Sequence, residues 1–130
     1  SSSVYGIELN KKAHQYSLEN IKLNRLTNVE LIQGDVNKKV PLLKEKFDRI
    51  IMPLPKTANK FLNLAFSKIK KNGIIHYYTW GKKDEDANIK NVINAIAEQN
   101  KKKIRIIKIK RVLPYAPKIY KLAIDIKCLN

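Results

Sequence analysis

Side chains that could bind or act on a ligand follow successive apolar segments in the first half of the chain. Glu8, Asp35 and the run Pro53-Leu54-Pro55 each come at the end of a segment whose apolar residues are typical of a buried strand. A carboxylate at the position of Glu8 can accept hydrogen bonds from both hydroxyls of a ribose. The Asp35 carboxylate can accept from the exocyclic amine of adenine, while the backbone around Gly34 and Val36 contacts the ring. Together these residues predict a nucleoside site.

Each of these signals has a simpler explanation when it is taken alone. Asp and Glu are common turn formers after strands. Pro53 and Pro55 fix two φ angles and remove two donors, so they suit a rigid strand-to-helix connection as well as a loop that supports a planar group. The occurrence of ligand-type residues at three successive strand ends favours a site, because ligands of open parallel sheets bind outside the carboxyl ends of the strands.

The elements that position these residues alternate between strand and helix. We expect strands at 4–8, 29–32, 47–52, 73–80, 103–112 and 119–129, and helices from Asn10 to about 24–26, from Thr57 to a stop at Asn72-Gly73, and at 87–100. The last two strands should pair antiparallel at a sheet edge, with one slip of phase at Ile106-Ile107. The alternation predicts an α/β doubly wound sheet, and 130 residues suffice for one domain.

The composition is strongly basic, with 27 Lys and Arg against 11 Asp and Glu and a formal net charge of +16. Such an excess favours a polyanionic partner, by default nucleic acid. A lysine-rich composition typical of an AT-rich genome is the alternative. Lys101 to Lys103, Lys108, Lys110 and Arg111 form a basic edge that suits phosphate contacts, or equally a strand edge guarded by lysines.

Several classes of protein are disfavoured. One cysteine, Cys128, excludes an internal disulfide and a Cys-based zinc site, and no metal site is expected around His14 or His76. For His76 a core position, with its ring satisfied by the backbone, is favoured over a general base. Tyr77, Tyr78 and Trp80 are candidates for base stacking or for the core. The sequence has no apolar run of membrane-spanning length and no signal-peptide pattern, which favours a soluble, cytoplasmic protein.

These segments, taken together, resemble a known family. The resemblance rests on the order and spacing of residues 4–10, Gly34-Asp35-Val36, Phe47 to Ala58, 73–79 and Tyr115-Ala116-Pro117. They are similar to the archaeal and eukaryotic tRNA (guanine-N1)-methyltransferase family, which uses S-adenosylmethionine to methylate the guanosine 3′ of the tRNA anticodon. The resemblance implies a Rossmann-like class I methyltransferase sheet with a C-terminal antiparallel strand pair, S-adenosylmethionine as cofactor and tRNA as partner.

The resemblance also implies roles for individual residues. Glu8 would bind the ribose of the cofactor and Asp35 its adenine, with Leu9, Val36 and Met52 as further cofactor-binding residues. The loop from Met52 through Pro53, Leu54 and Pro55 would lie beside the methyl donor and the target guanine, with the last three as catalytic positions. The family motif is Asn-Leu-Pro, and here Pro53 stands at the Asn position. Any hydrogen bond made by that amide must therefore come from another residue.

The resemblance further implies a strand and a Gly-rich loop that precede residue 4 in the family. That strand is central, between the strands at 4–8 and 47–52, so without it two strand edges are unpaired. Each unmet buried donor or acceptor costs ~1–3 kcal/mol. We therefore expect residues 1–130 to be a partial methyltransferase domain, completed by an N-terminal segment, a partner chain or a second copy. A non-catalytic tRNA-binding subunit and an aminocarboxypropyl transferase of wyosine synthesis are the alternative functions.

Overall fold

The computed structural model describes residues 3–52, 58–82 and 84–130. The chain divides into two compact units, residues 1–44 and 45–130, and each is described by itself. Within the described ranges no helix is long and apolar enough to cross a membrane.

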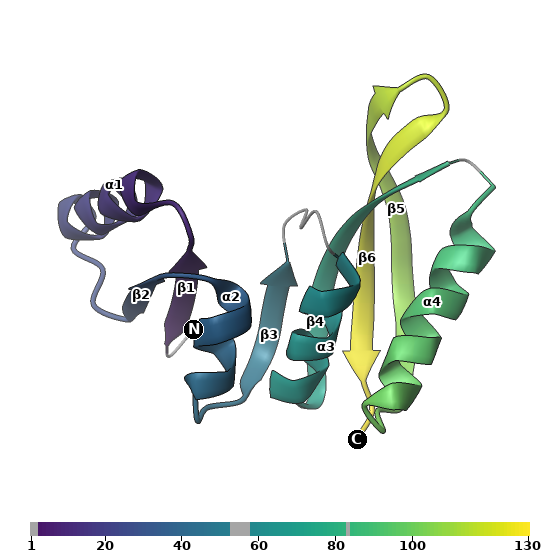
Figure 1. The fold of residues 1–130 in the computed structure, drawn as a ribbon, viewed down its shortest axis with the longest axis horizontal. Helices are drawn as coiled ribbons and strands as arrows, with labels where there is room; N and C mark the ends of the chain where they lie inside the picture. Colours follow the sequence, from purple (N-terminus) through teal and green to yellow (C-terminus); the bar gives the residue numbers. More distant parts are fainter. Residues whose placement is uncertain (1–2, 53–57, 83) are drawn as a thin grey trace. The chain divides into compact units, whose positions relative to one another are not determined.

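The first unit is a two-stranded parallel sheet whose strands are connected by a helix (Figure 1). Strand β1 (Val4–Glu8) is followed by helix α1 (Lys11–Leu23), strand β2 (Val29–Gln33), the short helix α2 (Val36–Lys39) and the 3-10 helix η1 (Val40–Leu42). The strands pair in register, from Val4 opposite Val29 to Glu8 opposite Gln33. The order strand, helix, strand is the one that the sequence predicts.

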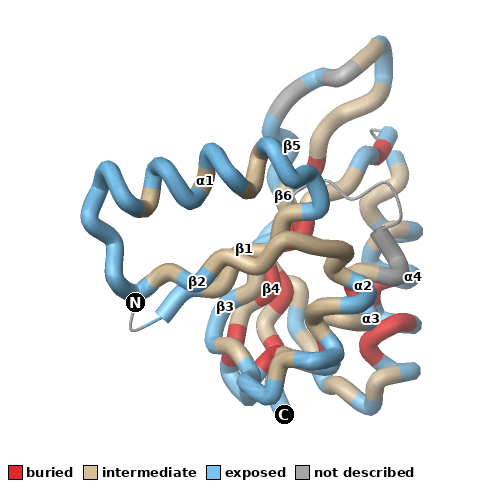
Figure 2. Tube along the Cα trace, turned by 60° about the vertical axis from the view of Figure 1, so that its left-hand side comes forward, coloured by how far each residue is buried: buried red, intermediate tan, exposed pale blue. Residues whose placement is uncertain are grey.

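Helix α1 begins at the predicted cap. The Asn10 side-chain oxygen accepts hydrogen bonds from the backbone N–H groups of Lys12 at 2.9 Å and Ala13 at 3.1 Å, which satisfies donors that have no partner inside the helix. The apolar stripe of the helix is not buried, since Tyr16 is 56% and Leu23 79% exposed. No described residue of the first unit is buried, as the tan and blue trace of α1, β1 and β2 in Figure 2 shows. Burial of apolar surface therefore stabilises this unit little.

The second unit is a four-stranded mixed sheet with two helices. It contains β3 (Phe47–Met52), α3 (Ala58–Lys68), β4 (Ile69–Lys82), α4 (Asp86–Gln99), β5 (Ile104–Ala116) and β6 (Ile119–Cys128). The strand order is β3-β4-β6-β5. Strand β3 runs parallel to β4, while β6 is antiparallel to both β4 and β5. The antiparallel terminal pair is thus confirmed, and β5 is the edge strand of the two.

The hydrophobic core lies between this sheet and helices α3 and α4. Alternate residues of β6 are buried while the residues between them are not, so β6 turns one face to the helices. Fully buried side chains come from both layers: Leu62, Phe66, Ile69, Ile75, Ile93, Leu122, Ile124, Ile126 and Cys128. Cys128, the one cysteine of the sequence, lies in this core as a free thiol.

The junction between α3 and β4 differs from the predicted one. The sequence places the helix stop at Asn72-Gly73, but α3 ends at Lys68 and β4 begins at Ile69. Ile69 is 1% exposed and pairs with Phe47 across the sheet. Asn72 has a φ of 66° and lies where the β3–β4 register is irregular. The Asn-Gly pair thus lies in an irregular part of the strand and does not end the helix, because burial and pairing of Ile69 outweigh continuation of the helix.

The two sheets leave strand edges without a neighbour. Within the described parts of the chain, β1 pairs only with β2, and β3 pairs only with β4. Ile51, on the edge strand β3, is 64% exposed. Both edges therefore retain backbone donors and acceptors that another strand can use.

Candidate functional site

The carboxyl ends of β1 and β2 bring Glu8 and Asp35 onto neighbouring strands. Glu8 lies opposite Gln33 in the strand register, and the Gly34 N–H donates to the Glu8 carbonyl at 2.9 Å. Asp35 follows directly. Parallel strands meet at the same edge of a sheet with their carboxyl ends together, which is where ligands of such sheets bind.

Glu8 organises the turn that leads into α1. Its Oε1 accepts a hydrogen bond from the backbone N–H of Asn10 at 3.0 Å, and Asn10 in turn caps the helix. The Leu9 carbonyl accepts from Gln33 Nε2 at 2.9 Å, which ties this turn to the end of β2, while the Leu9 side chain is 68% exposed. The turn is thus held from both strands.

Asp35 also accepts a hydrogen bond from a backbone N–H two residues further along, in the turn after β2. Its Oδ1 accepts from the backbone N–H of Asn37 at 2.9 Å and caps α2, whose first residue is the half-buried Val36. Gly34, directly before it, has a φ of +149°, a conformation that favours glycine. Glycine there lets the chain leave the strand and turn Asp35 into its cap position.

Both half-buried carboxylates fit a nucleoside. Each uses one oxygen to fix its own loop, and no hydrogen bond from another described residue is recorded to the second oxygen of either group. Acceptors of this kind suit ribose hydroxyls and an adenine amine. Among the described residues no group of three or more His, Cys, Asp or Glu side chains could hold a metal ion.

The remaining predicted site residues belong to the second unit. Met52 is the last residue of β3, 8% exposed, and pairs with Tyr77. Pro53, Leu54 and Pro55, the predicted catalytic positions, lie outside the described residues.

The aromatic run of β4 divides between the two faces of its sheet. Tyr77 is 4% exposed and lies in the core, whereas Trp80 is 42% exposed. The Tyr78 ring lies 5.0 Å from Lys121 Nζ in a cation–π contact. Burial raises the pKa of the Tyr77 hydroxyl above its usual value, and a side-chain hydrogen bond with Thr79 offsets part of that shift.

The prediction that His76 lies in the core is wrong: it is not among the buried residues, and its partner is a side chain that sequence reasoning did not identify. His76 Nδ1 lies 2.7 Å from Asp125 Oδ1, so the ring donates to the carboxylate across strands β4 and β6. Both side chains are half-buried. The residues are 49 positions apart, and only their alternation within two predicted strands indicated that they share a face.

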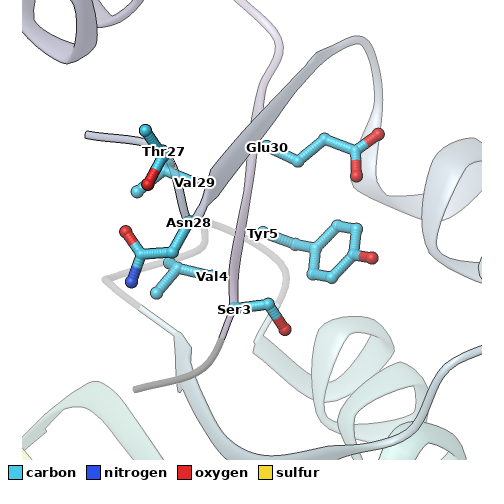
Figure 3. A pocket seen from close by; sticks show the side chains of 7 residues that line it. All are labelled: Ser3, Val4, Tyr5, Thr27, Asn28, Val29 and Glu30. Carbon is cyan, nitrogen blue, oxygen red and sulfur yellow. The ribbon is translucent and has the colours of Figure 1, made fainter. Parts of the chain in front are cut away.

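The first unit also has a small hollow, but at its opposite end (Figure 3). It has a volume of about 210 Å³ and is lined by residues at the start of the two strands: Ser3, Val4, Tyr5, Thr27, Asn28, Val29 and Glu30. Tyr5 and Glu30 form a cross-strand pair and project to the same side. Since sheet ligands bind at the carboxyl ends of strands, this hollow does not belong to the candidate site.

Acidic residues at the neighbouring carboxyl ends of two parallel strands are an arrangement that can hold a nucleoside, and comparison with known families specifies the class of protein. Residues 1–108 match the TRM5/TYW2 methyltransferase domain. The chain therefore belongs to this family, which confirms the resemblance inferred from its motifs.

Two curated relatives are equally similar in sequence. The chain is 37% identical over 125 residues to the tRNA (guanine(37)-N(1))-methyltransferase Trm5b of Pyrococcus abyssi, covering 95% of this chain and 37% of the relative. It is also 37% identical over 125 residues to the tRNA(Phe) (4-demethylwyosine(37)-C(7)) aminocarboxypropyltransferase of Methanocaldococcus jannaschii, covering 95% and 49%. The chain thus spans less than half the length of these curated relatives.

Solved structures confirm the fold. The crystal structure of Trm5b from Pyrococcus abyssi matches with a TM-score of 0.89 at 35% identity, over 99% of this chain and 38% of that one. The structure of M. jannaschii TYW2 in complex with AdoMet matches with a TM-score of 0.87 at 32% identity, over 99% and 58%. A complex of aTrm5 with tRNALeu matches with a TM-score of 0.79 at 35% identity, over 100% and 36%.

Proposed function

We propose that this chain is part of an S-adenosylmethionine-dependent tRNA methyltransferase that methylates N1 of the guanosine 3′ of the anticodon. Residues 1–130 would then be a partial methyltransferase domain. The observation that carries the proposal is the pair of carboxylates, Glu8 and Asp35, at the neighbouring ends of β1 and β2. It occurs in a chain that is 37% identical to Trm5b over 95% of its length.

The first unit would hold the nucleoside half of the cofactor. Glu8, with Leu9 beside it, accepts hydrogen bonds from the ribose hydroxyls, and Asp35 accepts from the adenine amine while Val36 contacts the ring. The turns that carry these residues are fixed by their own hydrogen bonds at 2.9–3.0 Å. Such fixed turns reduce the entropy lost on binding. When bound, the cofactor supplies a methyl group activated by a positively charged sulfur.

The segment from Met52 to Pro55 would orient the target base. This role for Pro53, Leu54 and Pro55 follows from the family resemblance. Two prolines restrict the loop and support a planar guanine, so the contribution of this loop is orientation. Pro53 has no side-chain amide and no N–H. Any hydrogen bond that the family's Asn side chain makes to the guanine must therefore come from a group other than Pro53.

We further propose that a strand from another segment or chain pairs with the unpaired edges of β1 and β3. A segment of a longer protein, a partner chain or a second copy could supply it. Two features support this: neither edge pairs with another described strand, and Ile51 is 64% exposed on its edge. The greater length of the relatives agrees with a further segment.

Two other functions remain as alternatives. Aminocarboxypropyl transfer from the same cofactor is supported by the 37% identity to the M. jannaschii aminocarboxypropyltransferase. A non-catalytic tRNA-binding subunit is supported by Pro53 at the motif's Asn position.

Incubation with methyl-labelled cofactor and an anticodon-region tRNA transcript separates the three functions. Methyl transfer predicts labelled RNA whose digested nucleoside has gained the mass of one methyl group. A parallel reaction uses tRNA that carries 4-demethylwyosine at the target position, the nucleoside named for the aminocarboxypropyltransferase relative. Gain of an aminocarboxypropyl group there, with the label left on the cofactor's by-product, supports the transferase alternative. RNA binding without either product supports the subunit. A transcript with adenosine at the target position is the control and should remain unlabelled.

A further inference from the structure

The positive charge of the chain is concentrated in the segment that runs from the end of α4 through β5 and into β6. From Gln99 to Ile124 the sequence has nine Lys and Arg residues and no Asp or Glu, so this segment supplies nine of the sixteen net positive charges. Those residues are Lys101, Lys102, Lys103, Arg105, Lys108, Lys110, Arg111, Lys118 and Lys121. A composition bias spread over the whole chain does not produce such a concentration.

Three of these cations form a row on one face of the edge strand. Arg105, Lys108 and Lys110 pair with Lys127, Asp125 and Ala123 of β6. Those three residues of β6 alternate with its buried ones, and cross-strand partners project to the same face. The row therefore lies on the face of the sheet opposite α3 and α4, and all three side chains are exposed.

None of the three cations takes part in an ion pair among the described residues, where the ion pairs join Lys70 to Asp48 and His76 to Asp125. Asp125 lies directly across from Lys108 and is the one carboxylate of β6, but its Oδ1 is turned to His76 Nδ1 at 2.7 Å. The row therefore carries more positive than negative charge and is available to an external anion.

Aromatic rings fix two further cations on the hairpin formed by β5 and β6. The Arg111 guanidinium carbon lies 5.5 Å from the centre of the Tyr120 ring, and Lys121 Nζ lies 5.0 Å from that of Tyr78. Figure 1 shows the long hairpin at the outer edge of the sheet, where β5 has no further strand beside it. A polymer can therefore approach along its length.

From these features we propose that β5, through Arg105, Lys108 and Lys110, is the surface that contacts the phosphate backbone of the RNA. The inference rests on the proposed function for the identity of the polyanion. Alternate residues of a strand are about 6.6 Å apart, so an edge strand presents cations in a line, as a phosphate chain requires.

Lysines on an edge strand also prevent strand addition, and this role would explain their presence without RNA. The two roles differ in their dependence on the sign of the charge. Glutamate protects an edge as well as lysine does, but it repels phosphate. Charge reversal therefore separates the two explanations.

The test measures binding of a fluorescent anticodon stem-loop by anisotropy over a range of salt concentrations. In the neutral variant Arg105→Gln/Lys108→Gln/Lys110→Gln, loss of three phosphate contacts should reduce the slope of log affinity against log salt by about 2 to 3. At moderate salt the affinity should fall roughly tenfold or more. The Lys108→Glu/Lys110→Glu variant should bind more weakly still while remaining monomeric by light scattering.

The matched control is Lys11→Gln/Lys12→Gln/Lys22→Gln, which removes the same charge from exposed positions of α1. It should leave the slope nearly unchanged. An equal loss in both triple variants, an unchanged slope in the β5 variant, or no RNA binding by the unaltered chain overturns the inference. Aggregation of the glutamate variant with intact RNA binding assigns the lysines to edge protection instead. Binding to phosphatidylserine vesicles that is lost in the β5 variant, with RNA binding retained, also overturns it.

This assay does not depend on methyl transfer, so the two proposals can fail separately. A methylated product together with an unchanged salt slope removes the β5 inference and leaves the proposed function. A reduced slope without any product leaves the β5 surface and removes methyl transfer by residues 1–130 alone.

Discussion

Replacing Glu8 provides the most direct test of the candidate cofactor site. The substitution Glu8→Gln keeps an oxygen at the position that accepts from the Asn10 N–H at 3.0 Å, so the turn into α1 should survive. It removes the negative charge of the group that would accept hydrogen bonds from the ribose hydroxyls. Hydrogen bonds to charged groups contribute about 1.5–3 kcal/mol and neutral ones about 0.5–1.5 kcal/mol. The loss of about 1–1.5 kcal/mol corresponds to roughly 5- to 12-fold weaker binding.

The second substitution, Glu8→Ala, removes the acceptor altogether. It should lose about 3 kcal/mol of binding free energy, roughly 150-fold in affinity, together with about 1 kcal/mol of stability from the turn. The cofactor affinities are measured by calorimetric titration of S-adenosylmethionine, and the stabilities by thermal unfolding. The order wild type, Gln, Ala is the expected result.

The control for this series is Glu30→Gln. Glu30 lies on β2 of the same sheet, opposite Tyr5 near the other end of the strands, and the substitution makes the same change in charge. It should alter affinity less than twofold. Equal affinities of wild type and Glu8→Gln, or an equal loss in Glu30→Gln, would refute the assignment of Glu8 to the ribose. Absence of binding by the unaltered chain refutes the idea that its first unit is a sufficient nucleoside site.

Three further predictions concern stability. Truncation of the fully buried Phe66 to Ala should cost about 3–5 kcal/mol in urea unfolding, and a loss below about 1.5 kcal/mol contradicts the position given to α3 in the core. The pKa of Tyr77 is raised by burial, so its stabilising contribution is present below the unfolded pKa of about 10 and is lost as pH rises through the higher folded pKa. Wild type should therefore lose stability more steeply than Tyr77→Phe above that pH, and parallel pH profiles contradict the burial effect. Gly34→Ala should destabilise the first unit by about 1–3 kcal/mol because of its φ of +149°. The added Cβ would also lie 2.5 Å from Lys39 Cε, so full recovery in Gly34→Ala/Lys39→Ala assigns the cost to that contact and not to the backbone.

Local features of the structure could be predicted from the sequence because they depend on neighbouring residues. Asn10 caps α1 through N–H groups two and three positions away, and the strand Phe47–Met52 ends where the apolar run stops. The slip at Ile106-Ile107 appears as an irregularity of the register between Ile106 and Lys108. The placement of Glu8 and Asp35 at strand ends was predictable for the same reason, since Glu8 is the last residue of β1 and Asp35 follows β2 after one glycine.

Tertiary structure decided the features that depend on pairing between segments far apart in the sequence. Ile69 joins β4 and not α3 because it pairs with Phe47, and His76 has Asp125 as its partner because β4 and β6 align. Alternation within β4 indicated that the aromatic residues divide between two faces, but only the position of the helices puts Tyr77 in the core. Sequence by itself therefore determined the order of the elements and the residues at their ends. Register, edges and covered faces were decided by contacts across the sheet, which local propensity does not encode.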